Sequence, residues 1–518
     1  MIGSLKSKRS RLRRVKANHV VMSPDDVREM ETRSRKRGYA AAEKRARYGD
    51  FRVSRGSADY ELRQGLVAVR AKSRYLARNS SFMRRFLWLL AINVVGKKGF
   101  MFQSRVKRLD GTPDASLNER VNTDFKRWSK RPTTCRQLSF TDLQKQAVKT
   151  LARDGEIIWE LVFNDKYPDG FAINPIEADL LDVYYNTKHH NGNEIKMGIE
   201  LDIHNAPVAY HFLTHHPGDA TYFSFQRKRS YRRVPVARVL HAFVSDRPGQ
   251  TRGEPWGATV INSIKMVDGY REAETTGRRL KSSIMGFFQR MMPGAQGIAE
   301  LSDQVDENDN MLEMSMEPGM LKELSPGLEF KSFDPGGAQT DFAEFENQIK
   351  KDISMGLMIS NMSLGMETQG ISYSAGRTIS LEDRDFYQDV QGFIVDRMLE
   401  PICDVWLSRR ILQDDSNIPP TRLDAIRENC IFRPRGWDWV DPAKDVRANR
   451  EALETGQTSL ARVAAARGID EDELLDEIQE TQRKLVERGL TLPLLQSNTN
   501  LNQSNDDDDD EDTNQNQS

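Results

Sequence analysis

The segment His241–Val260 (HAFVSDRPGQTRGEPWGATV) constrains the fold most, because it marks a junction between two kinds of secondary structure. It contains Pro248, Pro255 and three glycines, which interrupt regular structure and favour turns. The preceding residues 233–243 alternate apolar and polar side chains as a strand does, whereas the following residues show helical spacing. The sequence therefore predicts a turn-rich connector between a strand and a long helix.

The helix after this connector is predicted over Glu254–Arg290, roughly 30 residues or more, which is about 45–55 Å at 1.5 Å per residue. Its apolar residues are few: Val260, Ile261, Ile264, Val267 and Leu280. A helix with so narrow an apolar face is not easily covered by its own chain, so we expect it to pack against copies of itself in a symmetric oligomer. A single long surface helix is the alternative.

Charge is distributed unevenly along the chain. The 518 residues carry 76 Lys and Arg and 76 Asp and Glu, yet residues 1–100 hold 26 of the basic residues and only 8 of the acidic ones. Residues 1–55 are poor in large apolar side chains, so they are predicted to form a flexible basic arm, which either contacts nucleic acid or an acidic surface or is a solvated end. Residues 491–518, with the acidic run Asp506–Asp512, are predicted to be a disordered tail.

The three cysteines, Cys135, Cys403 and Cys430, lie far apart, which fits a reducing compartment and argues against a disulfide framework or a cysteine-rich zinc site. We expect all three to be small buried residues. The N-terminal residues lack the apolar stretch of a signal peptide, and the longest apolar run, Phe86–Val95, is only about half a membrane span. The sequence therefore predicts a soluble protein in which this run is a buried helix.

The remaining pattern predicts an α+β chain of three or four folding units. Helices are expected at Tyr60–Arg78, Phe82–Val95, Ser116–Lys130, Ser139–Arg153, Phe342–Met358, Thr378–Leu412, Ala443–Leu453, Ser459–Arg467 and Asp472–Arg488. A strand is expected at Glu156–Asn164, and residues 183–245 are predicted to be β-rich, with turns at Asn191-Gly192 and Pro217-Gly218. The helix Thr378–Leu412 is expected to bend at Pro401, and the Ser-, Gly-, Met- and Asn-rich segment Ile359–Gly376 to form a mobile loop.

The sequence lacks the common catalytic motifs GxxxxGK[ST], GxSxG, HExxH and CxxC. The pairs His189-His190 and His215-His216 lie in turn-rich segments where adjacent side chains are expected to point apart, so they are poor metal ligands. The pairs Asp179/Asp182 and Glu200/Asp202 are of the kind expected on a charged surface. We therefore predict a protein that is not an enzyme and has no catalytic residue, cofactor or metal.

Several short motifs occur in one order between residues 60 and 455. They are YLARNSSFMRRFLWLLAINVVGKKG (75–99), RDGE (153–156), GIELDIHNAPVAYH (198–211), HPGD (216–219), RPGQTRG followed by PW (247–256), EPG (317–319), LSPG (324–327), SYSAGR (372–377) and WDWVDP (437–442). In these motifs and their order the sequence resembles the lambda-type portal proteins of tailed bacteriophages.

The resemblance implies the portal fold, with a wing, a long-helix stem, a β-rich clip and an α-helical crown, assembled into a ring. It implies the following segments: a basic arm at 1–55, a wing at 56–182 leading into the first stem helix, the clip at 183–245, the connector and long stem helix at 246–290, a second part of the wing at 291–357, a tunnel loop at 358–376, a helical segment and crown at 377–490, and the acidic tail at 491–518.

The resemblance also implies the function. Portal proteins form a ring, usually of twelve copies, at one vertex of the capsid, through which double-stranded DNA is packaged and ejected. The implied partners are further copies of the chain, DNA in the channel, the terminase large subunit, head-tail connector proteins, and the major capsid and scaffolding proteins, with no membrane. The implied locations are the virion, at the portal vertex, and the host cytoplasm during assembly.

Two sets of residues are singled out. In the expected tunnel loop, Asn361, Gln369 and Tyr373 are predicted to contact moving DNA, through weak and repeated contacts, because a channel that passes any sequence cannot hold base edges tightly. In the connector, Arg247, Arg252 and Trp256 are candidates for contact with a neighbouring subunit or DNA. For the arginines the alternative, which we favour, is that they bond loop carbonyls and fix the turn.

Two other classes of function remain open from the residues alone. One is a nucleic-acid-binding protein that forms no ring and acts through its basic arm. The other is a hydrolase without a common motif. Ring formation distinguishes the first class from a portal protein, and metal- or nucleotide-dependent turnover distinguishes the second.

Overall fold

The computed structural model describes residues 55–219, 229–283, 287–290, 328–331, 342–413, 415–437, 442–469 and 471–488. All of these residues except Arg55 and Gly56 belong to one compact unit, Ser57–Ser518. The predicted basic arm, the acidic tail and most of residues 291–341 lie outside the described residues, so the predictions made for them stay predictions.

The first helices follow the expected apolar spacing closely. They are α3 (Ala58–Asn79), α4 (Ser81–Leu90), α5 (Ala115–Trp128) and α6 (Phe140–Asp154). A π-helical turn, η3 (Ala91–Val95), continues α4, and the apolar run Phe86–Val95 lies largely in the interior, as predicted. Within the described part of the chain, no helix has the length and apolar character needed to span a bilayer.

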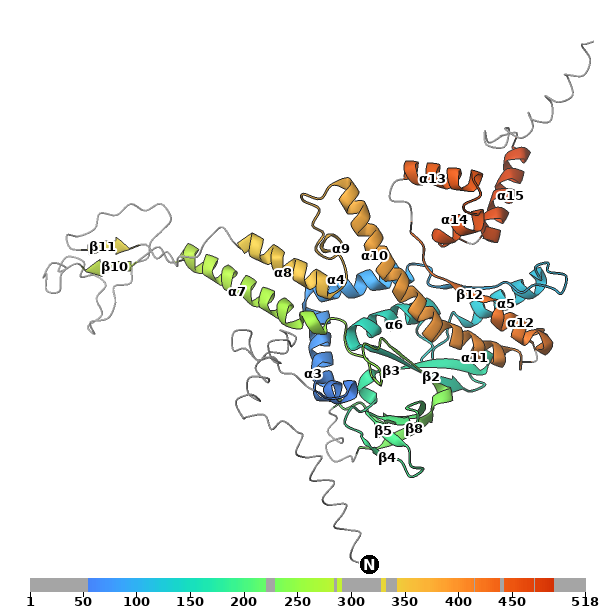
Figure 1. The fold of residues 1–518 in the computed structure, drawn as a ribbon, viewed down its shortest axis with the longest axis horizontal. Helices are drawn as coiled ribbons and strands as arrows, with labels where there is room; N and C mark the ends of the chain where they lie inside the picture. Colours follow the sequence, from blue (N-terminus) through green and yellow to red (C-terminus); the bar gives the residue numbers. More distant parts are fainter. Residues whose placement is uncertain are drawn as a thin grey trace, which may run out of the picture. The chain divides into compact units, whose positions relative to one another are not determined.

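Two antiparallel sheets follow in the chain (Figure 1). The three-stranded sheet has the order β3-β2-β9, with β2 (Glu156–Phe163) between β3 (Phe171–Ile176) and β9 (Val239–Phe243). The five-stranded sheet has the order β4-β5-β6-β7-β8, from β4 (Thr187–Lys188), β5 (Glu194–Lys196), β6 (Ile199–Leu201), β7 (Pro207–Leu213) and β8 (Tyr231–Pro235). The region 183–245 is β-rich as predicted, but its last strand, β9, pairs with β2 in the other sheet.

Two apolar cores hold these layers together. The larger one contains residues of the early helices, of β2 and of the late helices, with Phe86, Trp128 and Trp406 among its fully buried side chains. The smaller one lies between the two sheets and includes Ile158 of β2 and Phe212 of β7. The five-stranded sheet therefore packs on the three-stranded sheet through this smaller apolar core.

The long helix is shorter than predicted. A 3-10 turn, η7 (Ala258–Val260), precedes α7 (Ile261–Ser283), which is 23 residues long. Residues Phe287–Arg290 form β10, which pairs with β11 (Leu328–Lys331). The prediction of a helix up to Arg290 was wrong, because the aromatic segment FFQR has a strand partner available later in the chain.

The prediction that the chain cannot cover this helix was also partly wrong. Ile261, Ile264 and Val267 are buried within the chain, and α8 (Phe342–Gly356) packs against α7. Figure 1 shows α7 and α8 side by side. The contacts Ser263–Asp352 and Arg271–Glu346 make the two helices antiparallel.

The later helices are α9 (Asn361–Gly365), α10 (Tyr373–Ile394), α11 (Glu400–Arg410), α12 (Leu423–Glu428), α13 (Pro442–Glu454), α14 (Leu460–Ala466) and α15 (Glu471–Glu487). A π-helical turn, η9 (Val395–Leu399), joins α10 to α11, and Pro401, which cannot donate a backbone hydrogen bond, is the second residue of α11. The bend expected at Pro401 stays a prediction. The sequence did not predict β12 (Cys430–Arg433), which pairs with β1 (Met101–Ser104) and joins this part of the chain to the first helices.

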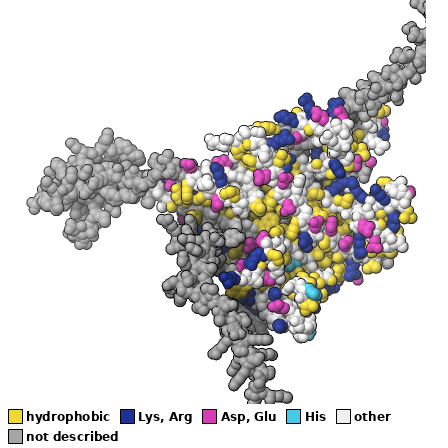
Figure 2. All heavy atoms as spheres, viewed as in Figure 1, with side chains coloured by type: hydrophobic (Ala, Val, Ile, Leu, Met, Phe, Trp, Pro, Cys, Tyr) yellow, Lys and Arg dark blue, Asp and Glu magenta, His cyan; other side chains and the backbone are white. Residues whose placement is uncertain are grey.

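Side chains of different types are mixed on the surface. On the face in Figure 2, hydrophobic, cationic and anionic side chains are interspersed, with no continuous patch of one charge sign.

Of the cysteines, Cys403 is buried and Cys430 is half-buried, but Cys135 is exposed, so the prediction that all three are buried was wrong for Cys135.

Candidate functional site

Two of the motifs, RDGE (153–156) and TRGEPW (251–256), meet in the interior. Gly155 ends α6 with a φ of 92°, a conformation that favours glycine. A Cβ on Gly253 would lie 2.1 Å from the carbonyl oxygen of Gly155, so the two backbones touch where no side chain fits. Both glycines are thus needed to bring the start of β2 against the connector.

This close approach places Glu156, the first residue of β2, among donors from three segments. The Nε of Arg252 donates to both carboxylate oxygens, at 3.0 and 2.9 Å. The Nη2 of Arg70, on α3, donates at 3.0 Å, and the Nε2 of His241, on β9, lies 3.1 Å away. Glu156, Arg70 and Arg252 are all buried, so helix, strand and connector are tied together inside the protein by one carboxylate.

Arg252 also bonds backbone carbonyls. Its Nη1 donates to the carbonyl oxygens of Leu181 at 2.8 Å and Met197 at 3.0 Å, and its Nη2 donates to that of Ala178 at 3.0 Å. These carbonyls lie in the chain that leads into and forms the five-stranded sheet. The guanidinium therefore fixes the connector against both sheets, as the structural interpretation of this arginine predicts.

The electrostatics of the cluster favour an architectural role. Burial alone would raise the pKa of Glu156, but the guanidinium groups of Arg252 and Arg70 outweigh burial and hold this pKa well below its usual value. A carboxylate that stays ionised and is surrounded by donors is a weak proton acceptor. The cluster is thus suited to positioning chain segments, and not to general-base chemistry.

A second charged cluster lies in the five-stranded sheet. The carboxylate of Glu200, on β6, accepts bonds from Arg233 at 2.8 Å, Asn191 at 2.9 Å and Asn193 at 2.8 Å, and lies 3.3 Å from His211. The hydrogen bond from Arg233 is the main cause of a strongly lowered pKa at Glu200. Burial lowers the pKa of His211, on β7.

The paired carboxylates noted in the sequence have separate partners. Asp179 pairs with Arg70 and Arg74, whereas Asp182 accepts bonds from Arg229 and Tyr231. Asp202 accepts backbone bonds within its own turn and does not share the partners of Glu200. Neither pair forms an acid-base dyad. The expectation that they lie on the surface was wrong for Asp182 and Glu200, which are buried because each has cationic or polar partners.

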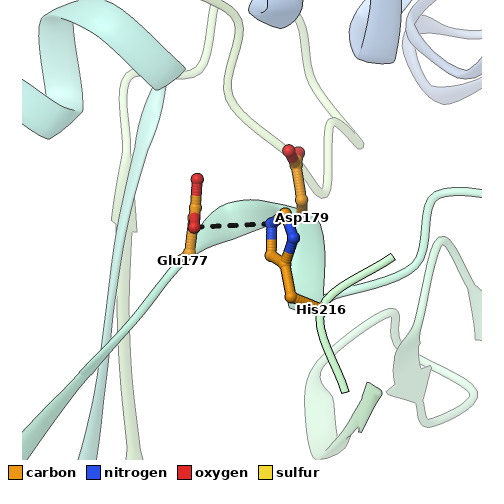
Figure 3. A group of neighbouring side chains, drawn as sticks. All are labelled: Glu177, Asp179 and His216. Carbon is orange, nitrogen blue, oxygen red and sulfur yellow. Dashed lines mark ion pairs between the residues drawn. The ribbon is translucent and has the colours of Figure 1, made fainter. Parts of the chain in front are cut away.

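One of the two histidine pairs, His189-His190, differs from expectation. The rings of His189 and His190 have centroids 3.9 Å apart, so these side chains do not point apart. His216 lies 3.4 Å from Glu177 and beside Asp179, and Figure 3 shows the three side chains together. Their possible ligand atoms lie within 4.8 Å of one another.

This group does not fit a metal site well. The carboxylate of Asp179 is already bonded by the guanidinium groups of Arg70 at 3.2 Å and Arg74 at 2.5 Å, and Arg74 also pairs with Glu177 at 2.9 Å. The two arginines supply the positive charge that a cation would supply. We therefore assign the group to the ion-pair network around Glu156 and not to a metal.

The structure separates the three connector residues predicted from the sequence. Arg252 is fully buried and bonded within the chain. Arg247 is half exposed and pairs with Glu61 at 2.7 Å, and Trp256 is half buried, with its ring 6.1 Å from that of Phe386. Contact with a neighbouring subunit therefore stays a proposal for Arg247 and Trp256 alone.

The expected tunnel loop, 359–376, is only partly a loop. It contains α9, and α10 begins at Tyr373, five residues before the predicted start. Asp383, on α10, accepts bonds from the hydroxyls of Ser360 at 2.6 Å and Ser363 at 2.5 Å, which fix α9 against α10. The exposed loop is thus confined to residues 366–372.

The three residues predicted to contact DNA differ in exposure. Gln369 and Tyr373 are exposed. Asn361 is half buried, and its side-chain amide donates to Glu367 at 2.9 Å. The three residues lie within or close to the loop 366–372 in the sequence, but only Gln369 and Tyr373 are exposed to solvent.

Glu156, Arg70 and His241 were not predicted from the sequence as members of the candidate site. A signal for Glu156 was present, because a charged residue at the head of the apolar strand EIIWELVF must find a partner. Arg70 shares a helical face with Leu66 and Ser73, which are also buried. Such a position predicts a buried arginine, although it does not identify the carboxylate that it meets.

The family described as "Phage portal protein, lambda family" matches residues 44–391, which include both motifs of the Glu156 cluster. A probable portal protein of Halomonas phage phiHAP-1 is 31% identical over 454 residues, covering 86% of this chain and 86% of the relative. Portal protein B of Escherichia phage lambda is 18% identical over 462 residues, covering 83% of this chain and 86% of the relative.

Solved structures show a weaker likeness. A chain from the neck of an empty GTA particle, computed with C6 symmetry, has a TM-score of 0.42 and 12% identity, with 78% of this chain and 94% of that chain covered. A chain from the neck of a native GTA particle, computed with C12 symmetry, has a TM-score of 0.41 and 11% identity, with 78% and 99% covered.

The family match and the portal-protein relatives identify a structural component of a phage particle. The chain belongs to the lambda family of phage portal proteins. It is thus a non-enzymatic virion protein that acts in DNA packaging, at the portal of the capsid.

Proposed function

We propose that the chain forms a ring of about twelve copies at one capsid vertex, with an axial channel through which double-stranded DNA is packaged and later ejected. The observation that carries this proposal is the family match over residues 44–391, together with a portal-protein relative aligned over 86% of the chain. The ring docks the terminase large subunit during packaging and head-tail connector proteins afterwards, and it contacts the major capsid and scaffolding proteins.

The helix pair α7 and α8 supports assembly with other copies. Large apolar side chains on these helices remain exposed, among them Met266, Phe345 and Met355. Exposed apolar side chains gathered on neighbouring helices are characteristic of protein contact surfaces. We assign this pair to the stem of the ring and to contacts between copies.

The remaining segments take the roles that the family resemblance implies. Residues 56–182 and 291–357 form the wing, except that α8 lies with the stem. The five-stranded sheet, β4 to β8, is the clip that docks the motor and neck proteins, residues 358–376 are the tunnel segment, and residues 377–490 lead into the crown. In the sequence, the basic arm at 1–55 precedes these segments and the acidic tail at 491–518 follows them.

DNA guidance in this proposal is passive. A channel that accepts every sequence offers weak phosphate or water-mediated contacts, since tight base contacts would halt movement. The exposed side chains of Gln369 and Tyr373 suit such contacts, and Asn361 would join them if the turn opened.

Packaging in vitro tests this function. Procapsids assembled with the chain should protect genome-length DNA from nuclease when terminase and ATP are added, and procapsids without it should protect none. A triple variant, Asn361→Ala, Gln369→Ala and Tyr373→Ala, should package more slowly or retain DNA less well. Normal packaging velocity and retention in the triple variant would remove these residues from the proposal, and packaging without the chain would overturn the proposed function.

A further inference from the structure

Three helices, α3, α4 and α6, line a pocket of about 510 Å³ that is rich in cations. Its cationic lining residues are Arg74, Arg78, Arg84, Lys149 and Arg153, and Glu177 is the one carboxylate in the lining. The pocket is thus a recess with an excess of positive charge, at a distance in sequence from the tunnel segment and the stem.

Two of the five cations are already neutralised. Arg74 pairs with Asp154 at 2.7 Å, Glu177 at 2.9 Å and Asp179 at 2.5 Å. Arg153 pairs with Asp154 at 2.6 Å. Even so, among the described residues the buried Nη2 of Arg74 has no hydrogen-bond acceptor. Because this nitrogen is buried, a ligand in the pocket does not reach it, and the other three cations are the ones available to a ligand.

The other three cations, Arg78, Arg84 and Lys149, form no ion pair with a carboxylate of the described residues. Arg78 and Arg84 are exposed at the pocket wall and form no ion pair there. The ammonium of Lys149 lies 3.5 Å from the ring centroid of Trp88. Burial, and then the charges of Lys145 and Arg153, lower the pKa of Lys149. The neighbouring positive charges that lower the pKa of Lys149 also favour the binding of an anion in the pocket.

We propose that this pocket binds the acidic run Asp506–Asp512 of the chain's own C-terminal segment. The run offers seven consecutive carboxylates to three cations that lack an acidic partner in the described structure. Between Glu487, where α15 ends, and Asp506 lie 18 residues, enough to span about 60 Å when extended. A tethered segment acts at an effective concentration in the millimolar range, so modest contacts are sufficient for binding.

Duplex DNA is a weaker candidate for this recess. The duplex is stiff over about 50 nm, so it lies along open surfaces and does not enter a pocket of this size. An acidic peptide bends freely and places one carboxylate at each residue. The proposal does not depend on ring formation, because the run can come from the same chain or from a neighbouring copy.

Carbodiimide cross-linking of the full-length protein, followed by mass spectrometry of its peptides, tests the proposal. This reagent joins a lysine amine to a carboxylate in direct contact with it, without a spacer. We expect a cross-link between Lys149 and a carboxylate of Asp506–Asp512. Replacing Arg78 and Arg84 together by Ala should lower its yield about tenfold, the factor that corresponds to about 1.4 kcal/mol.

Lys126, on α5, and Lys130, two residues after the end of α5, are exposed and lie outside the pocket lining, so they provide the matched control. Their cross-links to the acidic run should be rare, and Lys126→Ala with Lys130→Ala should leave the Lys149 cross-link unchanged. Mixing ¹⁵N-labelled and unlabelled protein distinguishes a run from the same chain from that of a neighbour. Equal yields at all three lysines, or protection of Lys149 by an oligonucleotide with no cross-link to the acidic run, would overturn the proposal.

Discussion

The carboxylate of Glu156 accepts bonds from Arg70, His241 and Arg252, which lie 85 to 96 positions away in the sequence. Removing its charge leaves Arg70 and Arg252 buried without their counter-ion. Breaking a buried pair by removing one partner typically costs about 3–5 kcal/mol, far more than an exposed pair contributes. Glu156 is therefore the residue whose loss most directly separates the connector from the two sheets.

We predict that Glu156→Gln lowers the free energy of unfolding by about 3–5 kcal/mol, because two buried guanidinium groups lose their carboxylate. Chemical denaturation of the purified protein measures this change. Glu61→Gln is the matched control, because it removes the exposed pair with Arg247 and should cost about 1 kcal/mol or less. Equal effects of the two substitutions would contradict an architectural role for Glu156.

The Glu200 cluster predicts a pH dependence. The pKa of Glu200 in the folded protein lies below its ordinary value of 4.5, so its charge adds stability above about pH 4.5 that is lost as the pH falls further. The pKa of His211 lies below 6.5, so the unfolded chain takes up a proton first, and stability also declines as the pH falls below about 6.5. Both groups favour the folded state near neutral pH.

We predict that Glu200→Gln lowers the melting temperature at pH 7 and makes its decline below pH 4.5 shallower than in the unmodified protein. Thermal unfolding recorded from pH 7 to about pH 3.5 measures both effects. The control is Glu194→Gln on β5 of the same sheet, where the exposed side chain of Glu194 contacts Lys196 at 3.5 Å. A parallel pH profile for the Glu200 variant would show that this carboxylate does not set the acid sensitivity.

At the level of elements, α7 and α8 carry both in-chain contacts and exposed apolar side chains. Met266 is 63% exposed and Met355 is 69% exposed, so acidic substitutions there change little within one chain. In a ring with the stem at contacts between copies, the same substitutions would bury charge without a partner. An acidic side chain at these positions is therefore tolerated in a single chain but destabilises contacts between copies.

We predict that Met266→Glu with Met355→Glu reduces the fraction of protein in rings while shifting the stability of a single chain by about 0.5 kcal/mol or less. Analytical ultracentrifugation measures the ring fraction, and chemical denaturation measures stability. Ile203→Glu is the control, since Ile203 is 90% exposed in a turn of the five-stranded sheet. Rings that form normally in the double variant would exclude these methionines from the contacts between copies.

Local spacing predicted the helices best. Helices α3, α5 and α6 begin and end within about two residues of their predicted limits, because their apolar spacing and caps are written in consecutive residues. Long-range pairing was not predictable in the same way. The pairing of β1 with β12 joins residues more than 300 positions apart, and β10 acquires its strand partner from Leu328–Lys331.

In the candidate site, too, the local motifs were predictable from the sequence and their long-range contacts were not. Both motifs of the Glu156 cluster were visible in the sequence, yet nothing local indicated that RDGE and TRGEPW meet. The close backbone contact between Gly155 and Gly253, which brings them together, is a tertiary property. Family resemblance supplied the class of protein, whereas the structure supplied the reason why these particular residues are placed together.

At the level of the whole molecule, the central claim is assembly into a ring with an axial channel. The most direct test combines the native mass of the purified protein in solution with negative-stain views of the particles. We predict a mass of about twelve chains of 59.3 kDa and rings with a central hole. A protein that stays a monomer in the presence of scaffolding protein, and binds DNA only through residues 1–55, would contradict it.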